Sequence, residues 1–222
     1  MRFLLIEDYN PRRRGGLPKK SRKRSFRKRL DCEVIAIGAS AGGLPALAEV
    51  LGGMGTEFPA IVVVQHLDPR HKSHLASLLA RKTRKLVKEA EDGEPLVPKT
   101  VYIGPPDEHL LVTREKLQLA HSRLIRFSRP SIDIMFSSVA AVYGSHVIGV
   151  ILSGSNRDGA DGIAAIKRAG GITMAQDPST AEYRIMPQAA IDTGCVDLVV
   201  PLNKMGKTIS ELIARSNKPA NG

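Results

Sequence analysis

Apolar runs of four to six residues recur along the chain and alternate with segments in which apolar residues have helical spacing. The runs 34–37, 60–64 and 147–152 are continuous and rich in β-branched residues, as in strands that are buried on both faces of a sheet. The alternation predicts an α/β fold. We expect an open, mostly parallel, doubly wound sheet with helices on both faces, in a Rossmann-like three-layer arrangement.

Shorter patterns complete this single domain, which we predict to extend over residues 33–215. Two apolar segments, 110–113 and 116–120, are separated by a tight polar turn and predict an antiparallel hairpin. The other predicted strands are 85–87, 100–103, 171–175 and 197–200. The predicted helices are 44–51, 73–82, 131–143, 160–169, a short one near Pro187, and 202–215.

The positive charge of the chain is concentrated before this domain. The formal net charge is +11, and residues 1–30 contain twelve Lys or Arg against two acidic residues, which leaves about +1 for residues 31–222. We interpret 1–30 as a basic, disordered tail, because it has little apolar surface to bury. It is either a solvated linker or a surface for nucleic acid, an acidic protein or anionic lipid. The nearly neutral domain is not expected to bind nucleic acid, and residues 216–222 are predicted to be a disordered C-terminus.

The first residues form a short apolar run that ends in the acidic pair Glu7 and Asp8. This run resembles the first strand and metal-binding acids of a response-regulator receiver domain, and an unpaired apolar tail is the alternative interpretation. No apolar run approaches the roughly 18–20 residues needed to cross a bilayer. Cys32 and Cys195 lack metal-ligand spacing, so we interpret them as reduced thiols of a cytoplasmic protein, which we expect to be a monomer.

A serine lies among glycines directly after the first buried run. The segment Gly38-Ala39-Ser40-Ala41-Gly42 fits the G-x-S-x-G nucleophile elbow, in which flanking glycines let the chain turn tightly and expose the serine oxygen. A phosphate-binding turn has the same order of strand, glycine turn and helix, although the G-x-G-x-x-G and Gly-Lys-Ser/Thr patterns are absent. This stretch alone leaves a nucleophile, a phosphate site and a packing turn open.

Three reactive side chains follow the carboxyl ends of buried strands: Ser40, His66 and Asp158. Because ligands of open α/β sheets bind at these ends, the three residues are candidates for a nucleophile, a general base and an orienting carboxylate. Each also has a structural interpretation. Ser40 and Asp158 are suited to capping the helices that follow them, and His66 to a hydrogen bond at the strand end.

Five segments in the same order closely resemble the CheB-type protein-glutamate methylesterase domain of bacterial chemotaxis. The resemblance covers residues 33–200, and its motifs are Gly-Ala-Ser-Ala-Gly-Gly at 38–43, Gln-His at 65–66, Arg-Pro-Ser-Ile-Asp at 129–133, the segment 153–159, and Gln-Asp-Pro-Ser-Thr-Ala at 176–181 with Met186-Pro187.

By this resemblance Ser40 is the nucleophile, His66 the general base and acid, and Asp158 the carboxylate that orients His66. The implied activity is hydrolysis of glutamyl methyl esters on chemoreceptor signalling helices, and in some members deamidation of receptor glutamines, with no cofactor or metal. A catalytically silent module that docks a receptor helix in the same cleft is the alternative function, and a nucleotide-binding protein is a third.

The resemblance also implies backbone N–H donors for the oxyanion near His66 and Ser155. The residues expected to form this oxyanion and substrate cleft are Ala41, Gly42, Gln65, Arg129, Ser155, Asn156 and Met186. The chain departs from the family pattern at Ala41, where Thr is usual, and at 154–156, where Gly-Ser-Asn replaces Gly-Met-Gly. A complete receiver domain is also missing, so the resemblance implies either no regulation or a separate receiver-domain partner.

Overall fold

The computed structural model describes residues 32–67, 73–114, 116–125 and 128–216. The predicted basic tail and its receiver-like run lie outside the described residues, as does nearly all of the predicted C-terminal segment. Along the described part, no helix is both long and apolar enough to cross a membrane.

Seven strands of the described chain form one sheet in the order β3-β4-β2-β1-β7-β8-β9, and every neighbouring pair is parallel. The hairpin strands β5 and β6 form a separate antiparallel pair. The predicted α/β class, with a mostly parallel sheet and a hairpin, is confirmed. The strand bounds are β1 (Val34–Ala39), β2 (Ala60–Gln65), β3 (Leu86–Glu89), β4 (Thr100–Ile103), β5 (His109–Val112), β6 (Leu117–Ala120), β7 (Val147–Ile151), β8 (Ile172–Gln176) and β9 (Leu198–Val200).

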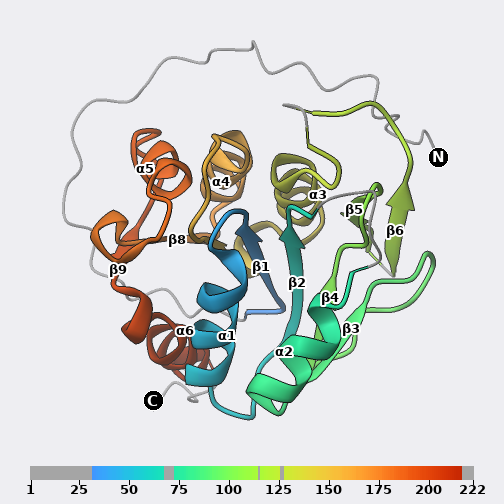
Figure 1. Ribbon diagram of the computed structural model, residues 1–222, viewed down its shortest axis with the longest axis horizontal. Coiled ribbons are helices and arrows are strands. Elements are labelled where there is room, and N and C mark those ends of the chain that lie inside the picture. Colours follow the sequence, from blue (N-terminus) through green and yellow to red (C-terminus); the bar gives the residue numbers. More distant parts are fainter. Residues whose placement is uncertain (1–31, 68–72, 115, 126–127, 217–222) are drawn as a thin grey trace, which may run out of the picture.

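Helices cover both faces of the sheet, with α1, α2 and α6 on one face and α3, α4 and α5 on the other (Figure 1). Two 3₁₀ turns, Gly144–His146 and Pro178–Thr180, were not predicted, because three residues are too few to show a periodic pattern. The helix bounds are α1 (Gly43–Gly53), α2 (Leu75–Thr83), α3 (Ile132–Tyr143), α4 (Ala160–Arg168), α5 (Ile185–Ile191) and α6 (Leu202–Ser216).

The central strand β1 supplies side chains to two apolar cores. Ile35 and Ile37 pack in the cluster beneath α1, α2 and α6, whereas Val34 and Ala36 pack in the cluster beneath α3 and α4. All four side chains are fully buried. Because successive side chains of a strand point to opposite faces, a strand covered on both sides must be apolar throughout, which explains the unbroken run in the sequence.

The direction in which successive strands are added to the sheet reverses at β1. Strand β1 pairs with β2 on one side and with β7 on the other. The connection from β1 to β2 passes through α1 on one face, and the connection from β7 to β8 passes through α4 on the opposite face (Figure 1). Such a switch point leaves a crevice at the carboxyl ends of the strands. The residues that follow β1, β2 and β7 therefore meet at the place where this fold binds ligands.

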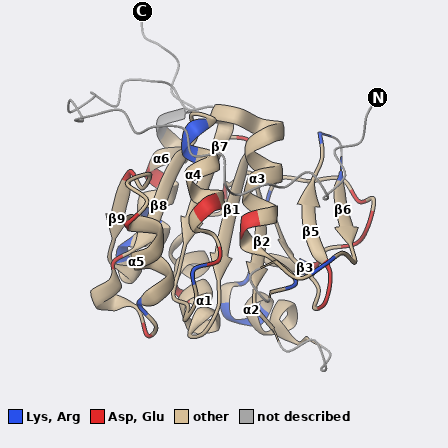
Figure 2. Ribbon diagram, turned by 90° about the horizontal axis from the view of Figure 1, so that it is seen from above, with Lys and Arg blue, Asp and Glu red and all other residues tan. Residues whose placement is uncertain are grey.

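Charged residues of both signs are distributed over the described elements (Figure 2). Asp161 lies in the first turn of α4, and the last turn of the same helix contains Lys167 and Arg168. Acidic residues at the start of a helix and basic residues at its end both interact favourably with the helix dipole. This distribution agrees with the nearly neutral charge of the sequence after the tail.

Helices α1 and α6 approach each other closely at Gly206. A Cβ atom on Gly206 would overlap the carbonyl oxygen of Val50 and lie 2.7 Å from the carbonyl carbon of Gly53. Both neighbours are backbone atoms, so neither can turn aside as a side chain does. The contact therefore requires glycine at this position of α6.

We expect Gly206→Ala to lower the free energy of unfolding by about 1–3 kcal/mol, because the two helices must move apart to admit the methyl group. The matched control is Gly52→Ala in α1, where an added Cβ has no atom within 4 Å. This control should be neutral or stabilising by up to about 1 kcal/mol, since alanine has the higher helix propensity. Urea denaturation measures both values. Equal stability of the two variants would contradict the close contact.

Candidate active site

The chain reverses direction directly after β1, at Ser40. The backbone N–H of Ser40 donates to the Ser153 carbonyl (2.9 Å), and the Ser40 carbonyl accepts from Gly43 N–H (2.8 Å) and from Gln65 Nε2 (2.7 Å). Gly42 has a φ of 70°, in the left-handed region that favours glycine. The turn is therefore held from three sides, and it fixes the position of the Ser40 side chain.

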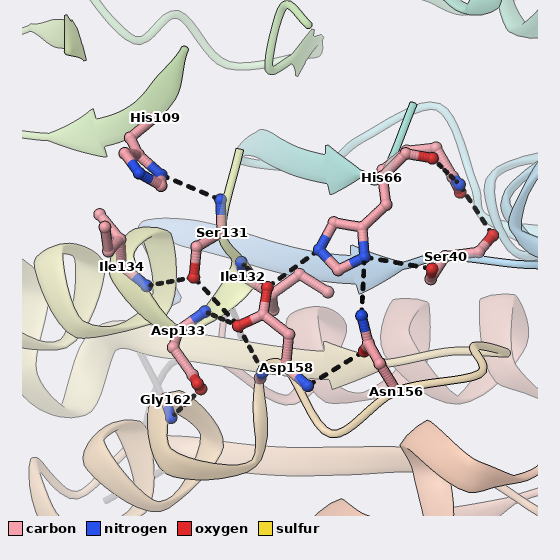
Figure 3. Close-up of polar contacts among 12 residues, drawn as sticks. Ser40, His66, His109, Ser131, Ile132, Asp133, Ile134, Asn156, Asp158 and Gly162 are labelled. Carbon is pink, nitrogen blue, oxygen red and sulfur yellow. Dashed lines mark hydrogen bonds and ion pairs between the residues drawn. The ribbon is translucent and has the colours of Figure 1, made fainter. Parts of the chain in front are cut away.

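The structure brings Ser40, His66 and Asp158 together in one hydrogen-bonded chain (Figure 3). His66 Nδ1 lies 3.1 Å from Ser40 Oγ, and His66 Nε2 lies 2.9 Å from Asp158 Oδ2. Because the ionised carboxylate can only accept, the ring proton of neutral His66 belongs on Nε2, and the lone pair of Nδ1 faces the serine hydroxyl. This arrangement can remove a proton from Ser40.

The carboxylate of Asp158 is fully buried and surrounded by hydrogen-bond donors at the start of α3 (Figure 3). The first N–H groups of a helix have no partner within the helix, so they are available to an anion. In addition to His66, the donors are Ser131 Oγ (3.0 Å), Ile132 N (2.7 Å), Asp133 N (3.1 Å) and Gly159 N (3.1 Å).

These donors decide the charge state of Asp158. Burial raises the pKa of this carboxyl group, but the hydrogen bond and charge interaction with His66 and the backbone N–H groups of Ile132 and Asp133 outweigh it. The net effect is a pKa below the ordinary value of aspartate. Asp158 is therefore the anionic partner of the histidine ring.

A second buried carboxyl group, that of Asp133, lies beside this site. Its Oδ1 accepts a hydrogen bond from the backbone N–H of Gly162 (2.8 Å). Burial, followed by the negative charge of Asp158, raises the pKa of Asp133 to about 7. Between about pH 4 and pH 7, Asp158 is therefore ionised, whereas Asp133 is neutral.

Several of the predicted cleft residues surround the Ser40 turn. Gln65 is buried and donates through Nε2 to the carbonyl groups of both Ser40 and His66. The carbonyl of Ala41 accepts from Ser153 Oγ (2.8 Å). Met186 is buried against Gly154, where an added Cβ would lie 2.6 Å from its sulfur atom.

Ser155 and Asn156 lie on the loop between β7 and α4. The Asn156 side chain lies 3.3 Å from His66 Nδ1, and the Ser155 side chain is exposed. The backbone N–H groups of Ser155 and Ala41 donate to no other described residue, so they are available as oxyanion donors. An oxyanion donor was also expected near His66. The backbone N–H of His66 is not available for this role, because it already donates to the Ala39 carbonyl (3.1 Å).

Among the described residues, Arg129 forms no hydrogen bond or ion pair with Ser40, His66 or Asp158. Its Nε and Nη2 atoms donate to Asp107 Oδ1 (2.9 and 2.6 Å), and its Nη1 atom donates to the Ser122 carbonyl. The side chain is 15% exposed, so the guanidinium is largely enclosed by this pair. Arg129 therefore connects the segment before α3 to the loop that precedes β5.

The sequence analysis did not select Ser131, Asp133 or His109 for the site. Ser131 caps α3 and donates to Asp158, and its own N–H donates to Nδ1 of the buried His109 (3.1 Å). Burial lowers the pKa of His109, and its Nε2 lies 3.0 Å from the Arg123 carbonyl. The motif at 129–133 was the available signal, since a serine before a helical pattern indicates an N-cap.

Comparison with known proteins identifies the family. The family model described as CheB methylesterase matches residues 35–209, which is most of the chain. The chain belongs to the CheB methylesterase family. This confirms the resemblance stated for the sequence motifs.

The relatives in the CheB family differ in length: the match spans nearly all of one relative and about half of another. A Leptospira interrogans relative is 40% identical over 188 residues, which are 84% of this chain and 95% of that protein. Protein-glutamate methylesterase/protein-glutamine glutaminase 2 of Anaeromyxobacter dehalogenans is 42% identical over 181 residues, 81% of this chain and 53% of that protein. The chain thus spans about half the length of this second relative.

A solved structure of the CheB family has the same fold. The crystal structure of the Thermotoga maritima CheB methylesterase catalytic domain superposes with a TM-score of 0.78 at 35% sequence identity. The match covers 82% of this chain and 100% of the crystallised one.

The neutral carboxyl group of Asp133 makes the stability of this CheB domain depend on pH. Because its folded pKa of about 7 exceeds the ordinary aspartate value of 3.8, the folded state binds more protons, and the associated stability is lost as pH rises from about 4 through 7. Asp133→Asn keeps an acceptor for Gly162 without this titration. We expect the variant to lose less stability between pH 4 and 8, with a slope that differs by up to about 1.4 kcal/mol per pH unit.

Urea denaturation at several pH values measures this difference. The matched control is Asp192→Asn, which changes an exposed carboxylate at the end of α5 and should leave the wild-type slope unchanged. If Asp133→Asn and the wild type have parallel curves between pH 4 and 8, Asp133 is not a neutral acid in the folded protein.

Proposed function

We propose that this protein is a serine-type carboxylic ester hydrolase that removes methyl groups from glutamate methyl esters of chemoreceptors, in the adaptation of bacterial chemotaxis. The observation that carries this proposal is the hydrogen-bonded chain Ser40–His66–Asp158, in which an acceptor nitrogen faces a serine hydroxyl. Membership of the CheB family supports the substrate class, because relatives carry the name protein-glutamate methylesterase.

The geometry supports a two-step acyl transfer. His66 Nδ1 takes the proton of Ser40 Oγ as the oxygen attacks the ester carbonyl, and Asp158 stabilises the imidazolium that forms. The tetrahedral oxyanion is held by backbone N–H groups, and the candidates are those of Ser155 and Ala41, which donate to no described residue. His66 returns the proton to the departing methoxide, and methanol leaves.

Hydrolysis of the acyl-enzyme repeats these steps with water as the nucleophile. His66 removes a proton from water, the hydroxide attacks the Ser40 ester, and the proton returns to Ser40 as the glutamate is released. One ester and one water thus give one carboxylic acid and one methanol. The protein residues alone supply this chemistry, so no cofactor or metal is required by the mechanism.

The same site also suits an amide substrate, with ammonia as the leaving group in place of methanol. The relatives' second name, protein-glutamine glutaminase, supports this as an additional activity of the chain. An amide is less reactive than an ester, so its hydrolysis depends more strongly on proton delivery to the leaving group by His66.

The proposed partners follow from the substrate. We propose that the cleft receives cytoplasmic helices of methyl-accepting chemoreceptors and that the protein acts in the cytoplasm as a monomer. The folded domain is not expected to bind nucleic acid. Whether the basic tail binds a polyanion stays an open prediction, because its residues lie outside the described part.

The first test is methanol release from a methylated chemoreceptor. We expect Ser40→Ala to lower the rate at least ~10³-fold, because the variant lacks the nucleophile that the other triad residues activate. The matched control is Ser145→Ala, in the 3₁₀ turn before the amino end of β7, at the opposite end of that strand from the triad, which should retain wild-type activity. A folded wild type that releases no methanol would favour the silent docking module, and a fully active Ser40→Ala would exclude Ser40 as the nucleophile.

A further inference from the structure

The amide of Asn156 contacts the histidine nitrogen that faces Ser40. Its Nδ2 atom lies 3.3 Å from His66 Nδ1, the same atom that lies 3.1 Å from Ser40 Oγ (Figure 3). The two hydrogen bonds of the triad do not require this contact.

The orientation of the Asn156 amide is determined by its other end. Its Oδ1 accepts a hydrogen bond from the backbone N–H of Asp158 (3.0 Å). The NH₂ group must then face the histidine ring, because exchanging the two amide atoms would place a donor against the Asp158 N–H. A donor thus faces His66 Nδ1.

This donor has opposite effects on the two charge states of His66. In the neutral ring Nδ1 carries a lone pair, and the Asn156 amide can donate to it. In the imidazolium Nδ1 carries a hydrogen, which would face the N–H of Asn156, and two donors at this distance repel each other. The amide therefore stabilises the neutral ring and disfavours its protonation.

We propose that Asn156 is a positioning residue that holds His66 as the neutral tautomer with its lone pair toward Ser40 and so extends activity to lower pH. The role rests on the proposed esterase function. Asn156 acts through His66, and it needs no contact with the substrate. In the resting enzyme, Ser40 Oγ and Asn156 Nδ2 therefore share His66 Nδ1 as acceptor. The hydrogen bond from Asn156 is lost when Nδ1 takes up the serine proton.

The other titratable groups around His66 are the same in the wild type and in variants at position 156. Asp158 contacts the ring directly. Asp133 lies in the first turn of α3 beside Asp158, His109 of β5 accepts from the Ser131 N–H before α3, and Glu182 lies against the Ser40 turn at Gly42. Substitutions at position 156 retain all of these groups. Asn156→Ala adds no charge, whereas Asn156→Asp adds one carboxylate in front of Nδ1, so differences between these variants report on the group at position 156.

Two substitutions separate the contact with the ring from the contact with the backbone. Asn156→Asp is nearly isosteric and keeps an oxygen for the Asp158 N–H, but it places an acceptor in front of Nδ1. Asn156→Ala removes both contacts. We expect the pH midpoint of His66 protonation to increase from wild type to Asn156→Ala to Asn156→Asp, with each step about one pH unit or less.

The experiment is an NMR titration of the ¹⁵N-labelled imidazole of His66 in the full chain without substrate, assigned with a His66→Gln variant. It reads ring protonation and tautomer directly, so it remains informative even if the protein releases no methanol. In an active protein the acid limb of the kcat/KM profile for methanol release should shift in the same order. Above the midpoint, where the ring is neutral, the expected wild-type tautomer has its single proton on Nε2.

Two results would overturn the proposal. Identical midpoints in all three proteins would show that the amide does not act on Nδ1. A midpoint that changes in Asn156→Ala but not in Asn156→Asp would assign the effect to the lost hydrogen bond with the Asp158 backbone, which is a structural role of the loop.

Discussion

The buried negative charge of Asp158 is the interaction on which the arrangement of this site depends. A carboxylate without partners in a protein interior costs several kcal/mol, so its burial requires donors from every side. Here the donors come from the end of β2, from the start of α3 and from the residue after Asp158 itself. Satisfying one charge thus fixes the relative positions of three segments that are far apart in the sequence.

The sheet topology makes this convergence possible. Because β1 pairs with both β2 and β7, the residues that follow these strands meet at one edge, and helices on opposite faces leave that edge uncovered. Hydrogen bonds to Gln65, the last residue of β2, and to Ser153, which follows β7, then fix the Ser40 turn. The nucleophile candidate and its base are therefore placed by strands that are buried along their whole length.

Local patterns in the sequence predicted the elements and the three strand ends, because hydrophobic periodicity and glycine turns are recorded in neighbouring residues. The contacts that depend on separate segments were not predictable in this way. No pattern indicates that Arg129 would pair with Asp107, that the His66 N–H would be used by the sheet, or that α3 would direct its first N–H groups at Asp158. Each depends on the distance between parts of the chain that only the fold brings together.

Two buried carboxyl groups can coexist at this site because only one of them is charged. The backbone N–H of Asp133 donates to Asp158, so this donor stabilises the neighbour's charge and not its own carboxyl group. Burial and this charge then raise the pKa of Asp133, while the donors and His66 lower that of Asp158. Paired groups whose pKa values are driven apart in this way are typical of sites with assigned acid and base roles. Below about pH 7 the result is a single negative charge, shared by the two Asp158 oxygens, one of which faces His66 Nε2; there it stabilises the imidazolium formed when Ser40 loses its proton.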